Sequence, residues 1–127
     1  MSSEIKSFRD LIAWQKAIAL CREIYAVSRG FPDAERFGLT SQIRRAAVSI
    51  PSNIAEGYGR NRTWDYVRFL DMARGSLHEV ETQLVLATEF RFAPENELVR
   101  CESAVRELDK IINGLARAVG EGVRRGT

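Results

Sequence analysis

The chain has 127 residues, 45% of them hydrophobic and 28% charged, a composition typical of one globular domain with a single buried core. No apolar run approaches the roughly 20 residues that a membrane-spanning helix needs, and the N-terminal MSSEIKSFRD lacks the apolar core of a signal peptide, so we expect no membrane contact and a cytoplasmic location. The net charge of +2 is too small to indicate a polyanion partner by itself. It is segmented, however: residues 36–74 carry seven basic and three acidic groups, and residues 75–109 carry three basic and eight acidic groups.

The first predicted helix runs from residue 11 to Gly30. Ser7 can cap its start, with Asp10 three positions later, and Gly30 can end it. Its apolar residues follow one another at steps of three and four, and we expect this stripe to face the core. The stripe consists of Leu11, Trp14, Ile18, Cys21 and Tyr25.

The second predicted helix contains a proline, in the segment QIRRAAVSIPSNIAEGYGR (residues 42–60). If Pro51 ended the helix, little more than one turn would remain before Gly57, so we expect one continuous helix kinked at Pro51. Because Pro51 lies beside the apolar stripe, we expect its ring to stay outside the core. The stripe is Leu39, Ile43, Ala46, Ile50, Ile54 and Gly57.

Two further helices follow. Thr63 is expected to cap the third, where Asp65 suits the positive end of the helix dipole, and Pro94 stands at the entrance of the fourth. The third stripe is Leu70, Ala73, Leu77, Val80, Leu84 and Ala87, extended backward by Tyr66. The fourth is Leu98, Cys101, Val105, Leu108, Ile112, Leu115 and Val119.

Short connections between the helices predict antiparallel neighbours. We therefore expect an all-α fold, an antiparallel up-down-up-down four-helix bundle over residues 1–120. Residues 121–127 are expected to form a flexible C-terminal tail, because GEGVRRGT is rich in glycine and charge.

Metal, cofactor and catalytic sites are not indicated. Cys21 and Cys101 lack CxxC spacing and are expected to be buried apolar residues, and His78 is the only histidine. GYGR lacks the strand and the lysine of a phosphate-binding loop. Glu79 and Glu81 are two positions apart on a helix and point in different directions. We expect no metal, no cofactor and no enzymatic activity.

Arginine outnumbers lysine 16 to 3, and many of the arginines gather in the middle of the chain. Arginine suits bidentate contacts to phosphate or carboxylate. Two interpretations stay open. The arginines bind phosphate, or they are solvated at the surface or bridge subunits. The candidates for nucleic-acid binding are Arg44, Arg60, Arg62 and Arg68.

Two surface features of the second helix indicate a contact between subunits. A polar ridge follows helical steps along one side of the apolar stripe, and a patch of small apolar residues lies on another side. The ridge is Gln42, Arg45, Ser49, Asn53, Glu56 and Arg60, and the patch is Val48, Pro51 and Ala55. The predicted oligomer interface consists of the ridge without Arg60, the patch, and Glu79 and Glu81 of the third helix.

The chain resembles the four-helix-bundle family of the 23S ribosomal RNA intervening-sequence proteins. The segments that carry the resemblance are FRDLIAWQKAIALCREIY, GLTSQIRRAAVSIPSNIAEGYGR and FLDMARGSLHEVETQL. The family is similar in fold to the accessory variability proteins of diversity-generating retroelements. The resemblance implies a bacterial cytoplasmic homopentamer without known enzymatic activity, with RNA, DNA or a protein such as a reverse transcriptase as partner. The matching positions are Gln42, Arg44, Arg45, Ser49, Pro51, Asn53, Glu56, Gly57, Gly59, Arg60, Gly75, Ser76, Glu79 and Glu81.

Two functional classes follow. The first is an accessory factor that binds nucleic acid weakly and non-specifically through its arginines. The alternative is a protein scaffold whose arginines serve ring assembly.

Overall fold

The computed structural model describes residues 4–124, which fold into helices without any strand. In chain order the elements are the 3₁₀ helix η1 (Phe8–Asp10), α1 (Ile12–Ser28), the 3₁₀ helix η2 (Asp33–Glu35), α2 (Leu39–Tyr58), α3 (Thr63–Glu89) and α4 (Glu95–Arg124). The all-α prediction is confirmed. No described helix combines the length and the apolar content that crossing a lipid bilayer requires.

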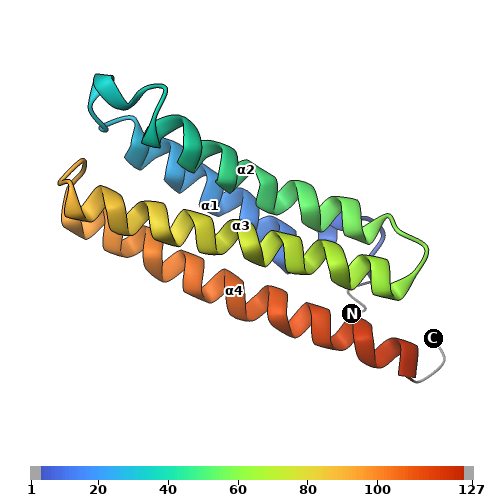
Figure 1. Ribbon diagram of the computed structural model, residues 1–127. Helices are drawn as coiled ribbons and strands as arrows, with labels where there is room; N and C mark the ends of the chain where they lie inside the picture. The colour runs from blue at the N-terminus through green and yellow to red at the C-terminus, as the bar shows by residue number, and fades with distance from the viewer. Residues whose placement is uncertain (1–3, 125–127) are drawn as a thin grey trace.

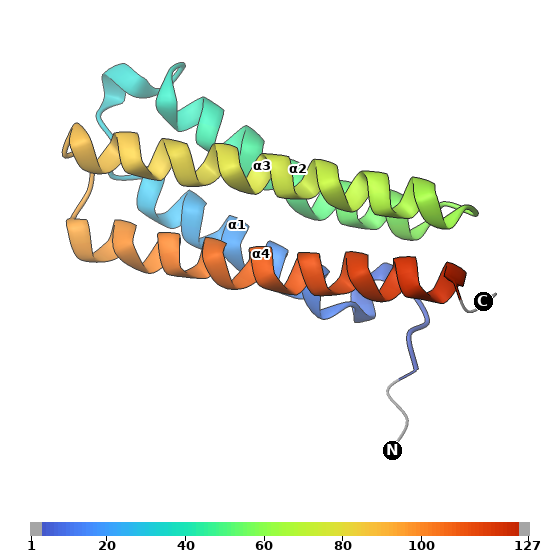
Figure 2. The same cartoon turned by 60° about the horizontal axis from the view of Figure 1, so that its bottom comes forward.

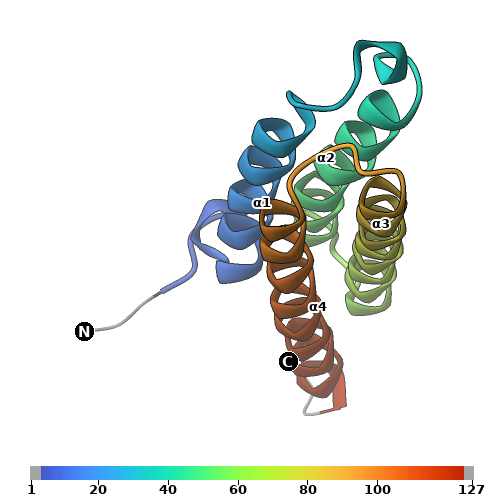
Figure 3. The same cartoon turned by 90° about the vertical axis from the view of Figure 1, so that its left-hand side faces the viewer.

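Each long helix packs against two others, because α1 and α3 both contact α2 and α4. The α1–α2 and α3–α4 connections lie at one end of the molecule and the α2–α3 connection at the other (Figure 1). Figure 2 shows α4 lying alongside α3. Seen end-on, the four helices surround one core, and the α1–α2 connection projects from the bundle (Figure 3).

The apolar stripes of α2 and α3 form the core as predicted. Every residue of both stripes is buried, from Leu39 to Gly57 and from Leu70 to Ala87. The α4 stripe is buried as far as Ile112, whereas Leu115 and Val119 are half-buried. Burial of these side chains provides most of the driving force for packing the four helices together.

The predicted core face of α1 is wrong by a partial turn of the helix. Tyr25 is 39% exposed, and Trp14 is half-buried against Phe8, with 5.4 Å between ring centroids. The buried positions of α1 are Ala13, Ala17, Leu20, Ile24, Val27 and Ser28. The buried face combines two alanines with Leu20, Ile24 and Val27, whereas the predicted residues Trp14, Ile18 and Cys21 are half-buried at its flank.

Helix α2 continues through Pro51, and a thiol from α1 compensates for the missing backbone donor. Proline has no N–H to donate to the carbonyl four residues earlier, which is that of Ala47. The Cys21 thiol donates a hydrogen bond to this carbonyl oxygen, with an Sγ···O distance of 3.2 Å. Burial raises the pKa of Cys21 to about 11, so the thiol keeps its proton near neutral pH.

The expectation that the Pro51 ring lies outside the core is also wrong, because Pro51 is buried. Ala47, one turn earlier on the same side of α2, is buried as well and accepts the bond from α1. This side of α2 therefore faces α1 rather than solvent. The kink at Pro51 stays a prediction.

The helix ends differ in part from the sequence predictions. Ser7 forms the predicted capping box with Asp10, because its hydroxyl accepts a hydrogen bond from the Arg9 N–H and the Asp10 carboxylate accepts one from the Ser7 N–H, but it caps η1; α1 begins after Leu11, which makes no side-chain capping bond. Thr63 does not cap α3 but is its first residue, after Arg62, whose side chain makes no capping bond. Helix α4 continues past the predicted boundary at residue 120 to Arg124, and residues 125–127 of the predicted tail lie outside the described residues.

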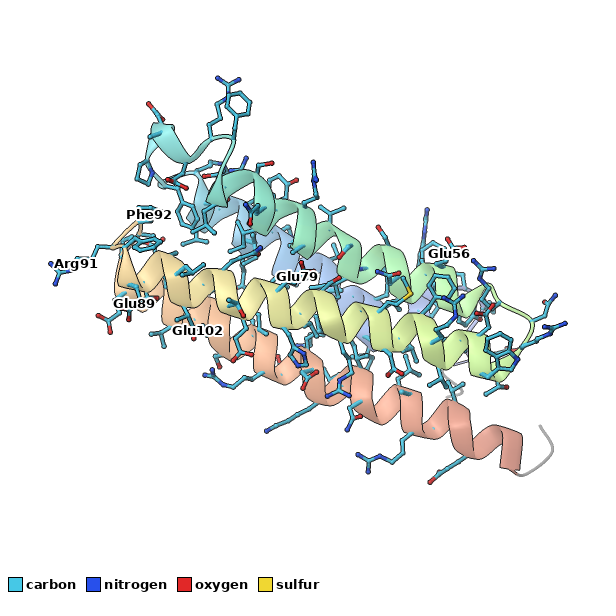
Figure 4. The ribbon with its side chains drawn as sticks, in the orientation of Figure 1. Glu56, Glu79, Glu89, Arg91, Phe92 and Glu102 are labelled. Atoms are coloured by element: carbon cyan, nitrogen blue, oxygen red, sulfur yellow. The ribbon has the colours of Figure 1, made fainter. Side chains whose placement is uncertain are left out.

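Aromatic packing anchors the end of the bundle from which the α1–α2 connection projects. Helix α3 ends with the Phe92 N–H bonded to the Ala87 carbonyl and with Arg91 at a φ of 58°. The Phe92 ring then contacts Phe31, which follows α1, at 5.8 Å between centroids. Figure 4 shows Arg91 and Phe92 at this end of the molecule.

The closest approach of α2 to α3 occurs at Gly57. A Cβ atom at this position would lie 2.8 Å from the Phe69 Cβ and 3.1 Å from the Tyr66 carbonyl oxygen. Neither atom moves by a simple change of rotamer. Glycine is therefore required here by the packing of the two helices.

We predict that Gly57→Ala lowers the free energy of unfolding by about 1–3 kcal/mol, because the added methyl group forces α2 and α3 apart. Gly114→Ala is the control, since a Cβ at Gly114 meets no atom within 4 Å. That change should raise stability by up to about 1 kcal/mol through helix propensity. Chemical denaturation measures both, and equal effects of the two substitutions would contradict the close-approach argument.

We further predict that Cys21 and Pro51 are energetically coupled. Cys21→Ala should lower the free energy of unfolding by about 1 kcal/mol, because the Ala47 carbonyl loses its donor. In a Pro51→Ala background the backbone N–H of the new alanine supplies that donor, and Cys21→Ala should cost less. A double-mutant cycle by urea denaturation measures the difference.

The control is Cys101→Ala, which removes a buried thiol without a hydrogen bond to Ala47. Its cost should be the same with either residue at position 51. Identical costs of Cys21→Ala in the two backgrounds would show that the thiol does not substitute for the helix bond.

Candidate functional site

A polar groove runs along the outer surface between α2 and α3. It has a volume of about 410 Å³, and a second hollow of about 350 Å³ continues from it along α3. Both are lined by Gln42, Glu79 and Gln83. We call this surface the α2–α3 groove; it is lined by Gln42, Arg45, Ala46, Ser49, Gly75, Ser76, His78, Glu79, Thr82, Gln83 and Leu86.

Hydroxyl groups close the floor of the α2–α3 groove. The Ser49 hydroxyl donates to the Ala46 carbonyl at 2.7 Å and shares a short hydrogen bond with the Ser76 hydroxyl of α3. Further along α2, the Asn53 side-chain amide donates to the Ser49 carbonyl at 2.9 Å. The predicted polar ridge therefore faces α3 of the same chain.

Several polar groups of the α2–α3 groove have no partner among the described residues. The Gln83 side-chain oxygen is buried and accepts no hydrogen bond. Arg45 and Glu79, on opposite walls, form neither an ion pair nor a side-chain hydrogen bond within residues 4–124. A buried polar atom without a partner costs free energy, so the Gln83 oxygen is the acceptor of this groove that a further hydrogen-bond donor would satisfy.

The structure brings together only part of the predicted oligomer interface. Gln42, Arg45, Ser49 and Glu79 line the α2–α3 groove, whereas Glu81, on the same helix, does not. Figure 4 shows Glu79 midway along α3 and Glu56 near the C-terminal end of α2. In the small-residue patch, Val48 is exposed, Ala55 is half-buried and Pro51 is buried.

Arg44 is held against α1 by its own chain. Its Nε donates to the Ser28 hydroxyl at 2.8 Å and its Nη2 to the Tyr25 carbonyl at 3.4 Å. The guanidinium also lies over the Tyr25 ring, 4.6 Å from the centroid. Arg44 is thus a tie between α2 and α1, and the adjacent Arg45 points into the α2–α3 groove.

The arginines of the α2–α3 turn are largely neutralised by nearby carboxylates. Arg60 pairs with Glu56 at 2.6 Å, and Arg68 pairs with Asp65 at 2.7 Å. Both guanidinium groups lie over the ring of Phe69, at 4.6 and 4.7 Å. Arg62 is exposed and forms no ion pair within the described part of the chain.

Sequence reasoning missed two residues of α3, Gln83, which lines the groove, and Met72, which is exposed. Gln83 carries the unsatisfied oxygen, and Met72 is exposed beside Arg68. The detectable signal was a glutamine three residues after the buried Val80 on an otherwise apolar helix face. Among the described residues no group of three His, Cys, Asp or Glu side chains is placed to hold a metal ion.

Comparison with known proteins places these features in context. The family model described as 23S rRNA-intervening sequence protein matches residues 9–114. A crystal structure described as a protein of unknown function from the S23 ribosomal protein family of Bacteroides thetaiotaomicron is similar in fold, with a TM-score of 0.77 and 19% identity, over 83% of this chain and 98% of that one. Proteins with curated descriptions gave no match.

We predict that Arg44→Ala lowers the free energy of unfolding by about 1–2 kcal/mol, because the tie from α2 to α1 is lost. The control is Arg106→Ala, which removes an exposed arginine of α4 without a hydrogen bond in the described chain. It should change stability by less than about 0.5 kcal/mol. Thermal or chemical denaturation compares the two, and an Arg44→Ala variant as stable as the control would disprove the tie.

Proposed function

The chain belongs to the 23S rRNA-intervening sequence protein family, and we propose that it is a non-enzymatic, cytoplasmic assembly protein whose copies associate through the α2–α3 groove. The observation that carries this proposal is the buried, unpartnered oxygen of Gln83. A second copy that supplies a donor would satisfy it. The family resemblance suggests a ring of five copies.

Charges on the two walls of the groove support the proposal. Arg45 and Glu79 lie close enough to line one hollow but do not pair with each other or with other described residues. Pairing each of them with the opposite charge on a neighbouring copy would compensate both. Reciprocal pairing between the same two copies would close as a two-fold dimer, whereas pairing with a different neighbour on each side is head-to-tail and closes into a ring.

Exposed apolar side chains on α2 and α3 point the same way. Leu86, which lines the groove, is 38% exposed, and Val48 on α2 and Met72 on α3 are 44% and 45% exposed. Gly75, between Met72 and Leu86 on α3, leaves open space where a side chain would be. Exposed apolar side chains on the two helices whose groove holds unpaired polar groups are more typical of a subunit interface than of a solvated helix surface.

Nucleic-acid binding by Arg44, Arg60, Arg62 and Arg68 as one cluster is less well supported. Arg44 is tied to α1, while Arg60 and Arg68 are paired with carboxylates. Arg62 alone would have to carry the phosphate contacts of the α2–α3 turn. Assembly is therefore the better-supported function for the residues predicted from the sequence.

The test is the mass of the protein in solution at micromolar concentration. A pentamer has a mass of about 72 kDa, five times the 14.3 kDa of one chain. We expect Glu79→Arg to shift the mass towards the monomer and raise the dissociation constant about tenfold or more, because two like charges then meet across the contact. Light scattering coupled to size exclusion measures the mass.

The control is Glu89→Arg, the same charge change at an exposed position near the end of α3 that does not line the groove. It should leave the mass unchanged. In the charge-swapped variant Arg45→Glu/Glu79→Arg the oligomer should return. A monomeric wild type, or a swap that fails to restore assembly lost in Glu79→Arg, would refute the proposed contact.

A further inference from the structure

On the outer face of α1, the α1–α2 connection and α2, arginines gather in two grooves that no acidic side chain lines. Two adjacent grooves of about 550 and 360 Å³ share Tyr25 on this face. No aspartate or glutamate lines either one, whereas Glu79 lines the α2–α3 groove and Glu23 and Glu97 line a groove between α1 and α4. The arginines that line the two grooves are Arg22, Arg29, Arg36, Arg44 and Arg45.

None of the five arginines that line these grooves forms an ion pair among the described residues. The side chains of Arg22 and Arg29 form no ion pair or hydrogen bond among the described residues. Glu35, next to Arg36 in sequence, uses its carboxylate to accept a hydrogen bond from the Leu39 N–H at 3.0 Å, at the start of α2. Grooves lined by one sign of charge attract ligands of the opposite sign.

Two aromatic rings lie among these arginines. Phe37 is 86% exposed, and the Arg36 guanidinium lies over its ring, 5.1 Å from the centroid. Tyr25 is covered in the same way by Arg44. With so much of the Phe37 ring exposed, surface remains for a further planar group to stack. Such a ring adds almost nothing to folding.

We propose that this face binds single-stranded nucleic acid, with arginines on the phosphates and Phe37 and Tyr25 stacking on bases. We call it the α1–α2 arginine face, defined by Arg22, Tyr25, Arg29, Arg36 and Phe37. Combining a positive groove with aromatic stacking is how single strands are bound without sequence preference. A duplex presents phosphates but keeps its bases stacked internally.

The shape of the face favours a strand over other polyanions. A chain of nucleotides can lie in two consecutive hollows, and it presents phosphates and bases at a short repeat along its length. An acidic peptide would pair with the arginines but would leave Phe37 without a stacking partner. This inference goes beyond the proposed assembly: of the arginines that line these two grooves, only Arg45 also lines the α2–α3 groove, and it is left out of the α1–α2 arginine face.

The experiment measures fluorescence anisotropy of labelled oligo(U) RNA and oligo(dT) DNA of about 20 nucleotides, longer than the site of one small domain. We expect both to bind at about 50 mM salt and to weaken steeply by about 200 mM salt, as phosphate contacts do. The proposed contacts are to phosphates and base faces, which the two probes share, so their affinities should be similar. A duplex of equal length should bind more weakly.

Charge-removing variants locate the contact. Arg22→Gln/Arg29→Gln/Arg36→Gln should weaken binding and reduce the slope of log affinity against log salt by about 2, since each phosphate contact to a single strand contributes about 0.7. The matched control is Arg100→Gln/Arg106→Gln/Arg117→Gln, which removes three exposed arginines from α4. It should leave the slope unchanged.

Aromatic variants test the stacking. Phe37→Ala should weaken binding about fivefold or more, the equivalent of ~1 kcal/mol for one stacked base. Trp64→Ala is the control. Trp64 is also an exposed aromatic residue, but it lies at the start of α3, at the opposite end of the bundle. It should leave the affinity unchanged.

Four results would overturn the inference: no binding of either probe by the wild type at about 50 mM salt, equal affinity for duplex, equal effects of the two triple variants, or binding to phosphatidylserine vesicles in the absence of oligonucleotide binding. Light scattering on the same samples separates this test from that of the proposed function. The arginine-face variants should keep the wild-type mass, so that lost binding cannot be attributed to lost assembly.

Discussion

The hydrogen bond from the Cys21 thiol to the Ala47 carbonyl is the constraint on which α2 depends. Pro51 leaves that carbonyl without its helical donor, and a donor from α1 allows the helix to continue. Because α2 is continuous, Ile54 and Gly57 stay in phase with Ile50 and pack in the core. The same bond joins α1 to α2 at a fixed register, and burial raises the pKa of the thiol that makes it.

Helix α2 divides two surfaces between adjacent arginines. Consecutive residues of an α-helix point about 100° apart, so Arg44 and Arg45 serve different sides. Arg44 stiffens the contact with α1 by binding Ser28 and covering Tyr25. Arg45 projects towards the α2–α3 groove, where Gln83 lacks a partner. The proposed assembly surface lies on the α3 side of α2, whereas the proposed nucleic-acid surface lies on α1 and the α1–α2 connection.

Local charge balance, rather than the number of arginines, decides which surface attracts anions. The α2–α3 turn looked basic in sequence, but Glu56 and Asp65 pair with its arginines. In α1, Arg22 and Glu23 are neighbours in sequence and line different grooves. Helical geometry separates these opposite charges, so a segment with a balanced count presents a basic face on one side.

The sequence by itself determined the helical fold, the core faces of α2 and α3, and the Ser7–Asp10 capping box, though not that this box caps η1 rather than α1, because these features depend on local periodicity and on hydrogen bonds between near neighbours. It did not determine the core face of α1, where small Ala13 and Ala17 are buried and larger Tyr25 is not. Nor did it show the thiol that donates to the Ala47 carbonyl in place of the N–H that Pro51 lacks, the unpartnered oxygen of Gln83, or the gathering of Arg22, Arg29 and Arg36. Only the tertiary structure decided these, since each depends on which side of one helix meets a residue distant in the chain.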